Sequence, residues 1–177
     1  MRKQFILSIL TFLVTALLSS VTARGQAQAA SDPWQSLRFL IGTWDAKTTS
    51  GTAAAQSNGI YSFGLELKDH ILARHSSNGA CKAPADFNCD HSDLLYLFLD
   101  HQSIKAIYFD NEGHVIHYSV STPTPASVVF LSDSSLPGPQ FRLAYERSQS
   151  ILSGKFQMKM PGQSEFTSYL EWSGNRK

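Results

Sequence analysis

From Thr43 to the C-terminus the sequence is a series of short segments in which apolar and polar residues alternate, separated by turn residues. Alternation with a period of two is typical of β-strands that bury one face, and no part of this region has the pattern of a long helix. The ten segments lie at residues 43–50, 59–67, 70–76, 93–100, 104–109, 114–121, 127–131, 141–147, 152–160 and 166–172. Because mostly short turns join them, antiparallel strands in up-and-down order are expected, and closure into a barrel would remove exposed strand edges. We therefore predict an all-β fold, a ten-stranded antiparallel up-and-down β-barrel, with a two-sheet sandwich as the alternative.

The segment before the first strand has the pattern of a short helix. Asp32 is placed to act as its N-cap, and Pro33 follows at a position where a missing N–H costs no hydrogen bond. Trp34, Leu37 and Ile41 recur at helical spacing and form one apolar face. A helix of about two turns is too short to form a core of its own, so we expect it to close one end of the barrel.

The first 29 residues have the pattern of a secretory signal peptide. Arg2 and Lys3 supply the positive start, Phe5 to Leu18 is an apolar run, and Ala27-Gln28-Ala29 offers small residues for cleavage. The alternative is an N-terminal membrane anchor, but the run holds about 14 residues, fewer than the roughly 20 that cross a bilayer. We predict a signal peptide at 1–29 and a protein that is secreted or periplasmic.

The remaining residues, 30–177, are numerous enough for one domain with a substantial core. This part contains twelve basic and fourteen acidic residues, and its Lys and Arg residues form no cluster. Such a balance argues against nucleic acid and against an anionic membrane surface as partners. No second hydrophobic span follows, so we expect no integral membrane segment after cleavage of the signal.

Two cysteines, Cys81 and Cys89, occur in a chain that the signal would direct to an oxidising compartment. We predict a structural disulfide between them. A metal site and a redox pair are the alternatives, but the spacing matches neither a zinc knuckle nor Cys-x-x-Cys.

The hexapeptide Phe39-Leu40-Ile41-Gly42-Thr43-Trp44 joins the helix to the first strand. Its Gly permits a sharp turn, and its Trp is large enough to plug the end of a barrel. With the ten strands, this segment resembles the calycin superfamily, which includes lipocalins, fatty-acid-binding proteins and nitrobindin-like barrels. It looks most like the Phe-Leu-x-Gly-x-Trp opening of nitrobindin-type and related bacterial lipocalin-like domains. The segment from Tyr108 to His114 is similar to the aromatic-Asp-x-x-Gly hairpin of the latter group.

The resemblance implies a barrel that holds a small apolar ligand. In lipocalins an Arg from a late strand covers the Trp, and here Arg147 and Arg176 are the candidates for that role. Nitrobindins hold haem through a His near the C-terminus, whereas this chain has no His after His117. Haem therefore has no matching ligand, and no cofactor is expected.

Alternation along the last strands indicates a lining that is rich in aromatic and Met residues. Tyr145 and Arg147 share a face and could clamp a carboxylate, much as fatty-acid-binding proteins do with Arg and Tyr. The alternative, favoured by its position at the strand end, is that Arg147 lies in solvent or stacks on Trp44. The candidate ligand-binding residues are Tyr145, Arg147, Phe141, Leu143, Phe156, Met158 and Trp44.

No metal site or catalytic residue is predicted. The histidines are badly spaced for joint ligation, because His114 and His117 fall on opposite faces of a strand, as do His70 and His75. No Gly-x-Ser-x-Gly motif occurs, and both cysteines are expected to be bonded. We therefore predict a barrel that binds a small hydrophobic or amphipathic molecule. The alternatives are an isomerase or hydrolase acting on an apolar substrate in the cavity, and an envelope interaction module with a filled barrel.

Overall fold

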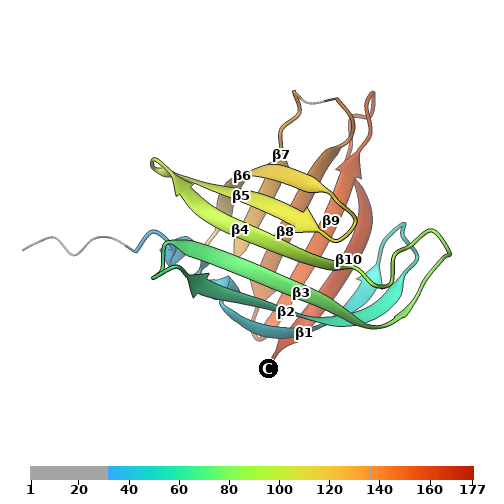
Figure 1. Cartoon of the computed structure of the whole chain (residues 1–177), viewed down its shortest axis with the longest axis horizontal. Coiled ribbons are helices and arrows are strands. Elements are labelled where there is room, and N and C mark those ends of the chain that lie inside the picture. Colours follow the sequence, from blue (N-terminus) through green and yellow to red (C-terminus); the bar gives the residue numbers. More distant parts are fainter. Residues whose placement is uncertain (1–31, 136) are drawn as a thin grey trace, which may run out of the picture. The chain divides into compact units, whose positions relative to one another are not determined.

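The computed structural model describes residues 32–135 and 137–177, so the predicted signal peptide lies outside the described residues. Ten antiparallel strands follow in up-and-down order, and the first pairs with the last to close a barrel (Figure 1). The all-β, ten-stranded antiparallel barrel is thus confirmed. The strands are β1 Gly42–Ser50, β2 Gln56–Glu66, β3 Ile71–Lys82, β4 Ser92–Asp100, β5 Ser103–Asp110, β6 Val115–Thr124, β7 Ser127–Ser132, β8 Gln140–Ser148, β9 Ile151–Lys159 and β10 Thr167–Arg176.

Two strands are clearly longer than predicted. β3 continues from Ser76 to Lys82, because its polar last residues still pair with the start of β2 as far as Gln56. β10 continues beyond Trp172 to Arg176, where it pairs with Trp44 at the start of β1. In both extensions apolar and polar residues no longer alternate. Backbone hydrogen bonds to the neighbouring strand stabilise the strand conformation there.

The predicted helix is present as a 3-10 helix, η1, at Gln35–Leu40. The prediction of Asp32 as its N-cap is wrong, because the helix begins at Gln35 and Trp34 lies at the N-cap position. Asp32 instead holds the preceding turn, since its Oδ1 accepts a hydrogen bond from the backbone N–H of Trp34 at 3.0 Å. The Trp34 indole donates to the backbone oxygen of Asp69 at 2.8 Å, which ties the helix to the β2–β3 turn, and Leu37 and Leu40 are fully buried. Within the described part of the chain, no helix has the length and apolar character needed to cross a membrane.

The Gly42-Thr43-Trp44 segment connects η1 to the barrel through a set of contacts. Gly42 has φ +139°, a conformation that side chains disfavour, and a Cβ there would lie 3.0 Å from Nε of Arg176. The Arg176 guanidinium lies over the ring of Trp44 at 5.8 Å and donates to the Ile41 oxygen at 3.0 Å. Of the two arginine candidates, Arg176 therefore covers the tryptophan. The closed ten-stranded antiparallel barrel is consistent with a calycin-like fold.

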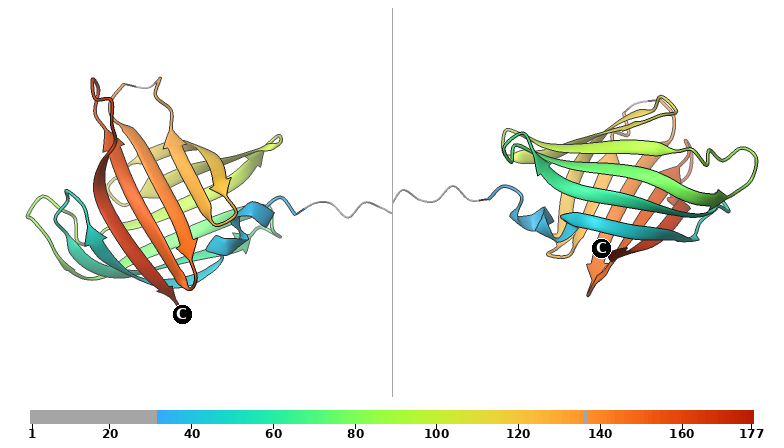
Figure 2. Two further views of the ribbon diagram at one scale, coloured as in Figure 1. Left: turned by 180° about the vertical axis from the view of Figure 1, so that it is seen from behind. Right: turned by 60° about the horizontal axis from the view of Figure 1, so that its bottom comes forward.

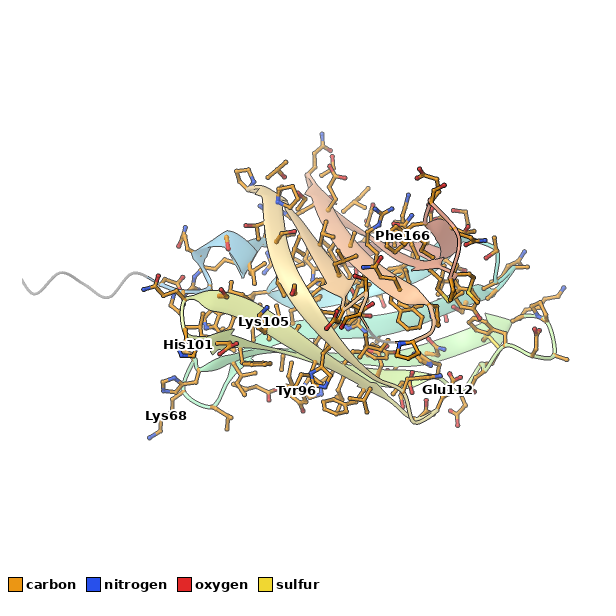
Figure 3. All side chains as sticks on the ribbon, turned by 90° about the horizontal axis from the view of Figure 1, so that it is seen from above. Lys68, Tyr96, His101, Lys105, Glu112 and Phe166 are labelled. Atoms are coloured by element: carbon orange, nitrogen blue, oxygen red, sulfur yellow. A yellow bond between two sulfur atoms is a disulfide. The ribbon has the colours of Figure 1, made fainter. Side chains whose placement is uncertain are left out.

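The two ends of the barrel differ. At the η1 end the interior is packed with buried side chains, among them Leu72, Leu97, Val128, Phe130 and Leu152. The opposite end is bordered by the β1–β2 and β5–β6 turns and by the β3–β4, β7–β8 and β9–β10 loops (Figure 2). In Figure 3, Lys68 and His101 mark the η1 end and Glu112 marks the opposite one. The predicted disulfide, Cys81–Cys89, connects the end of β3 to the β3–β4 loop.

Candidate functional site

The barrel contains a cavity of about 580 Å³ in the half away from η1. Strand alternation turns a largely apolar set of side chains toward it, and Phe141 and Phe156 stack there with ring centroids 5.7 Å apart. The apolar wall consists of Ile116, Phe141, Leu143, Phe156, Met158 and Leu170. Half-exposed Met160 and residues of the β3–β4 loop and β5–β6 turn form the mouth.

The inner end of the cavity is polar, and we call it the polar floor: Arg74, Ser76, Asp93, Tyr118, Tyr145 and Trp172. Arg74 on β3 is only 4% exposed, and its guanidinium donates to the Asp93 carboxylate and to the Tyr145 hydroxyl. β3 and β4 are neighbours with Ser76 directly opposite Asp93, and Ser76 Oγ donates to Asp93 Oδ2 at 2.6 Å. Residues from two adjacent strands thus hold a buried ion pair inside an apolar barrel.

The charges of this pair stabilise each other. Burial alone would raise the pKa of the Asp93 carboxyl, but the positive charge of Arg74 and hydrogen bonds from His91 and Ser76 outweigh it and lower that pKa to about 2. Burial alone would lower the pKa of Arg74, but Asp93 and Tyr145 outweigh that effect and raise it. Burial raises the pKa of Tyr145 to about 12 and also raises the pKa of Tyr118. At neutral pH the floor therefore holds one positive charge, one negative charge and neutral phenols.

Three buried polar atoms of the floor have no hydrogen-bond partner among the described residues: Nε of Arg74, the hydroxyl oxygen of Tyr118 and Nε1 of Trp172. Trp172 owes its position to Gly154, which lies directly opposite it on β9. A Cβ at Gly154 would lie 2.2 Å from the indole ring, so the ring occupies the space that any larger residue would need. The residues of the floor line the cavity, but these three atoms are themselves covered by neighbouring atoms. A buried polar atom without a partner is uncommon in folded proteins.

A second cluster lies at the mouth around His91 of the β3–β4 loop. Its Nδ1 is 2.7 Å from Glu112 Oε1, and its Nε2 is 3.1 Å from the Tyr108 hydroxyl and 3.4 Å from Asp93 Oδ2. The hydrogen bond with Asp93 raises the pKa of His91; burial opposes this, and Glu112 raises the pKa further. When protonated, the imidazolium connects the loop to the β5–β6 turn and to the polar floor.

His91, Asp110 and Glu112 could share a metal ion, because one ligand atom from each lies within 4.8 Å of the others. Asp110 already accepts hydrogen bonds from the backbone N–H groups of Glu112 and His114, at 3.0 and 2.9 Å. Its carboxylate therefore also serves to hold the β5–β6 turn in shape.

The residues predicted from the sequence fall in three places. Four of them, Phe141, Leu143, Phe156 and Met158, line the apolar wall. Tyr145 lies in the polar floor and contacts Arg74, whereas Arg147 is exposed at the end of β8, and the two do not form a clamp. Trp44 is buried at the η1 end, where Arg176 covers it.

Arg74, Asp93 and the mouth cluster are not among the residues predicted from the sequence. The sequence does contain a pattern that indicates the ion pair. Arg74 follows the apolar Leu72 on the inward face of β3, and Asp93 precedes Leu95 on the inward face of β4. A charged residue in register with buried leucines is a candidate for a functional buried group. The mouth cluster joins a loop to a distant turn, which no spacing along the chain indicates.

A comparison with protein-family models and a search of curated proteins each found no match to this chain.

Proposed function

We propose that this protein binds a small amphipathic molecule inside its barrel, in the manner of a lipocalin-like carrier. The observation that carries the proposal is the cavity of about 580 Å³, with an apolar wall above a polar floor. Its volume falls within the roughly 300–1,000 Å³ typical of small-molecule sites, and a few convergent polar groups in an apolar cavity are typical of them too. An open interior also favours this function over that of an interaction module with a filled barrel.

The wall is suited to a flexible apolar chain. Stacked Phe141 and Phe156 form a flat surface, while Met158 and Met160 adapt to irregular shapes between the wall and the mouth. The buried ion pair lies at the inner end, so a ligand with one polar end would enter with that end first. Resemblance to lipocalins and fatty-acid-binding proteins agrees with this arrangement.

Native mass spectrometry of the purified protein, before and after organic extraction, tests the proposal. We expect a small apolar mass that extraction releases, and we expect the Met158→Trp variant to lack it, because the larger side chain projects into the cavity. Leu131→Trp is the matched control, since Leu131 lies on the outer face of β7 and is 38% exposed. A protein that arrives empty and takes up no apolar fluorescent probe would refute ligand binding.

Export is part of the same proposal. A carrier of this kind would act in the periplasm or the medium, where the Cys81–Cys89 disulfide is stable. The intact mass of the exported protein tests it, because removal of residues 1–29 predicts a chain beginning at residue 30. An exported protein that keeps these residues would refute cleavage.

A further inference from the structure

We propose that the mouth of the barrel binds a divalent transition-metal ion, Zn²⁺, through His91, Asp110 and Glu112. His91 belongs to the β3–β4 loop, Asp110 ends β5, and Glu112 follows in the β5–β6 turn, at the end of the barrel that Glu112 marks in Figure 3. One ligand atom from each residue lies within 4.8 Å of the others. The ion borders the cavity, and its binding is independent of the apolar ligand proposed above.

The donor atoms favour this class of ion. Zn²⁺ takes imidazole nitrogen and carboxylate oxygen, whereas Ca²⁺ and Mg²⁺ take oxygen ligands. Two ligand atoms on one tetrahedral Zn²⁺ lie about 3.3 Å apart, so side-chain movements of about 1 Å close the cluster around the ion. The side chain of Glu112 is 37% exposed and has room for such a movement. Three protein ligands leave a fourth position for water.

The two ring nitrogens of His91 give a second, independent argument. Nε2 is 3.1 Å from the Tyr108 hydroxyl and 3.4 Å from Asp93 Oδ2, while Nδ1 is 2.7 Å from Glu112 Oε1. Both nitrogens thus face oxygen atoms, but a neutral imidazole has a single N–H. With the hydrogen on Nε2, the lone pair of Nδ1 faces a carboxylate, and this contact needs a positive charge between the two groups. A metal ion on Nδ1 supplies that charge, which a second proton supplies in the metal-free protein.

The inner side of His91 has the contacts of a supported metal ligand. Metal-binding histidines usually donate their other ring N–H to a carboxylate or another oxygen, which fixes the orientation of the ring. Asp93 lies in that position beside Nε2, and it is itself held by Arg74 and Ser76. The polar floor therefore supports the ring of His91 from inside the barrel.

Asp110 is a buried carboxylate, since its side chain is only 4% exposed. Its Oδ1 accepts from the backbone N–H groups of Glu112 and His114, which fixes the carboxylate and leaves Oδ2 beside the Tyr108 hydroxyl and His114 Nδ1. Among the described residues, the ion-pair partners of Asp110 and Glu112 are histidines, and neither carboxylate pairs with Lys or Arg. Buried charges in proteins are paired or coordinate metals, and Zn²⁺ balances both carboxylates at once.

Asn111 holds the two halves of the site together. Its side-chain oxygen accepts from the backbone N–H of Ser92 at 3.0 Å, and its side-chain nitrogen donates to the backbone oxygen of Asp90 at 2.6 Å. The backbone N–H of Asn111 also donates to the Ser92 oxygen at 3.1 Å. His91 lies between Asp90 and Ser92, so these bonds hold it against the β5–β6 turn before any ion binds.

Isothermal titration calorimetry of the untagged protein, first stripped of metal with a chelator, tests the proposal with Zn²⁺, Ca²⁺ and Mg²⁺. We expect one Zn²⁺ per chain with a Kd of about 1 μM or lower. Ca²⁺ and Mg²⁺ should bind at least about 100-fold more weakly, because one ligand is an imidazole nitrogen. Absence of saturable Zn²⁺ binding, or equal affinity for Ca²⁺, would overturn the proposal.

Single variants locate the ion. His91→Gln and Glu112→Gln each remove one ligand and should weaken Zn²⁺ binding at least about tenfold. His75→Gln is the matched control and should leave the affinity unchanged. His75 Nε2 is also 2.7 Å from a carboxylate oxygen, that of Glu66, but the described residues supply no third ligand there. Equal affinity in the His91 and Glu112 variants and the unmodified protein would place the ion elsewhere and overturn the proposal.

Asp93→Asn tests the support from the polar floor. This change should weaken Zn²⁺ binding by about 10-fold to 100-fold, as loss of a carboxylate behind a metal-bound His does elsewhere. Unchanged affinity in a variant whose far-UV circular dichroism is unaltered would refute the role of Asp93, and the His91 and Glu112 variants decide the site itself. Zn²⁺ binding by a protein that takes up no apolar probe would refute the carrier function alone and support the metal site.

Discussion

The buried ion pair of Arg74 and Asp93 supports a quantitative prediction for Arg74→Met, which keeps most of the side-chain volume. The two side chains are 5% and 9% exposed, so water screens their charges very little. Removing one partner from a buried pair costs about 3–5 kcal/mol because the other charge remains unpaired. Asp93 keeps its contacts with Ser76 and His91 in this variant. We therefore expect the free energy of unfolding to fall by about 3 kcal/mol, near the lower end of that range.

The pH dependence of that loss identifies its cause. The pKa of Asp93 is about 2 in the folded protein and 3.8 is its ordinary value, so its contribution to stability is present above about pH 4 and disappears as pH falls toward 2. Without Arg74 the folded pKa rises and this contribution shrinks. The difference in stability between the unmodified protein and Arg74→Met should therefore be largest near neutral pH and decrease below about pH 4.

Urea unfolding followed by tryptophan fluorescence, from about pH 7 down to pH 3, measures both quantities. The double variant Arg74→Met with Asp93→Asn should recover much of the loss, because it removes both charges. Arg38→Met is the matched control at the exposed pair with Asp32 and should change stability little. A loss below about 1 kcal/mol for Arg74→Met, or a loss that does not vary with pH, would refute the argument.

Three further predictions concern the neighbouring elements. Gly154→Ala should displace the Trp172 ring and cost about 2 kcal/mol in urea unfolding, whereas Gly64→Ala, with no atom within 4 Å of the added Cβ, should cost clearly less; equal losses would contradict the assigned packing. The hydrogen bond with Asp93 raises the pKa of His91, so its contribution to stability is present below about pH 6.5 and is lost as pH rises through the folded pKa. His91→Gln should therefore destabilise more at about pH 5.5 than at pH 8.5, and an equal loss at both would exclude the charged form as the cause. Replacing Cys81 and Cys89 together with Ser should cost about 2.5 kcal/mol in the chain-entropy model, and unchanged thermal unfolding would show that the closed loop adds no stability.

The barrel is predictable from the sequence because each strand has one buried face, and alternation reports that burial directly. Strand ends are predicted less accurately where neither face of the strand is buried, because apolar and polar residues do not alternate there. Ser77 to Lys82 at the end of β3 is polar, and its strand conformation depends on pairing with β2, which the sequence of one strand does not show. The same reason explains the extension of β10 along β1.

The apolar wall is likewise predictable, since Phe141, Leu143, Phe156 and Met158 follow the alternation of β8 and β9. The polar floor is harder to predict. Arg147 and Arg74 both lie on inward faces, but Arg147 lies at a strand end where solvent reaches it, whereas Arg74 lies midway along the barrel opposite Tyr145. Depth within the barrel depends on the stagger of all ten strands, which alternation within one strand does not specify.

An equilibrium titration of the protein with an apolar fluorescent probe tests most directly whether the cavity is a ligand site. We expect saturable binding of one molecule per barrel, lost in Met158→Trp and retained in Leu131→Trp. Binding that does not saturate, or that survives equally in both variants, would place the ligand outside the cavity and contradict the account.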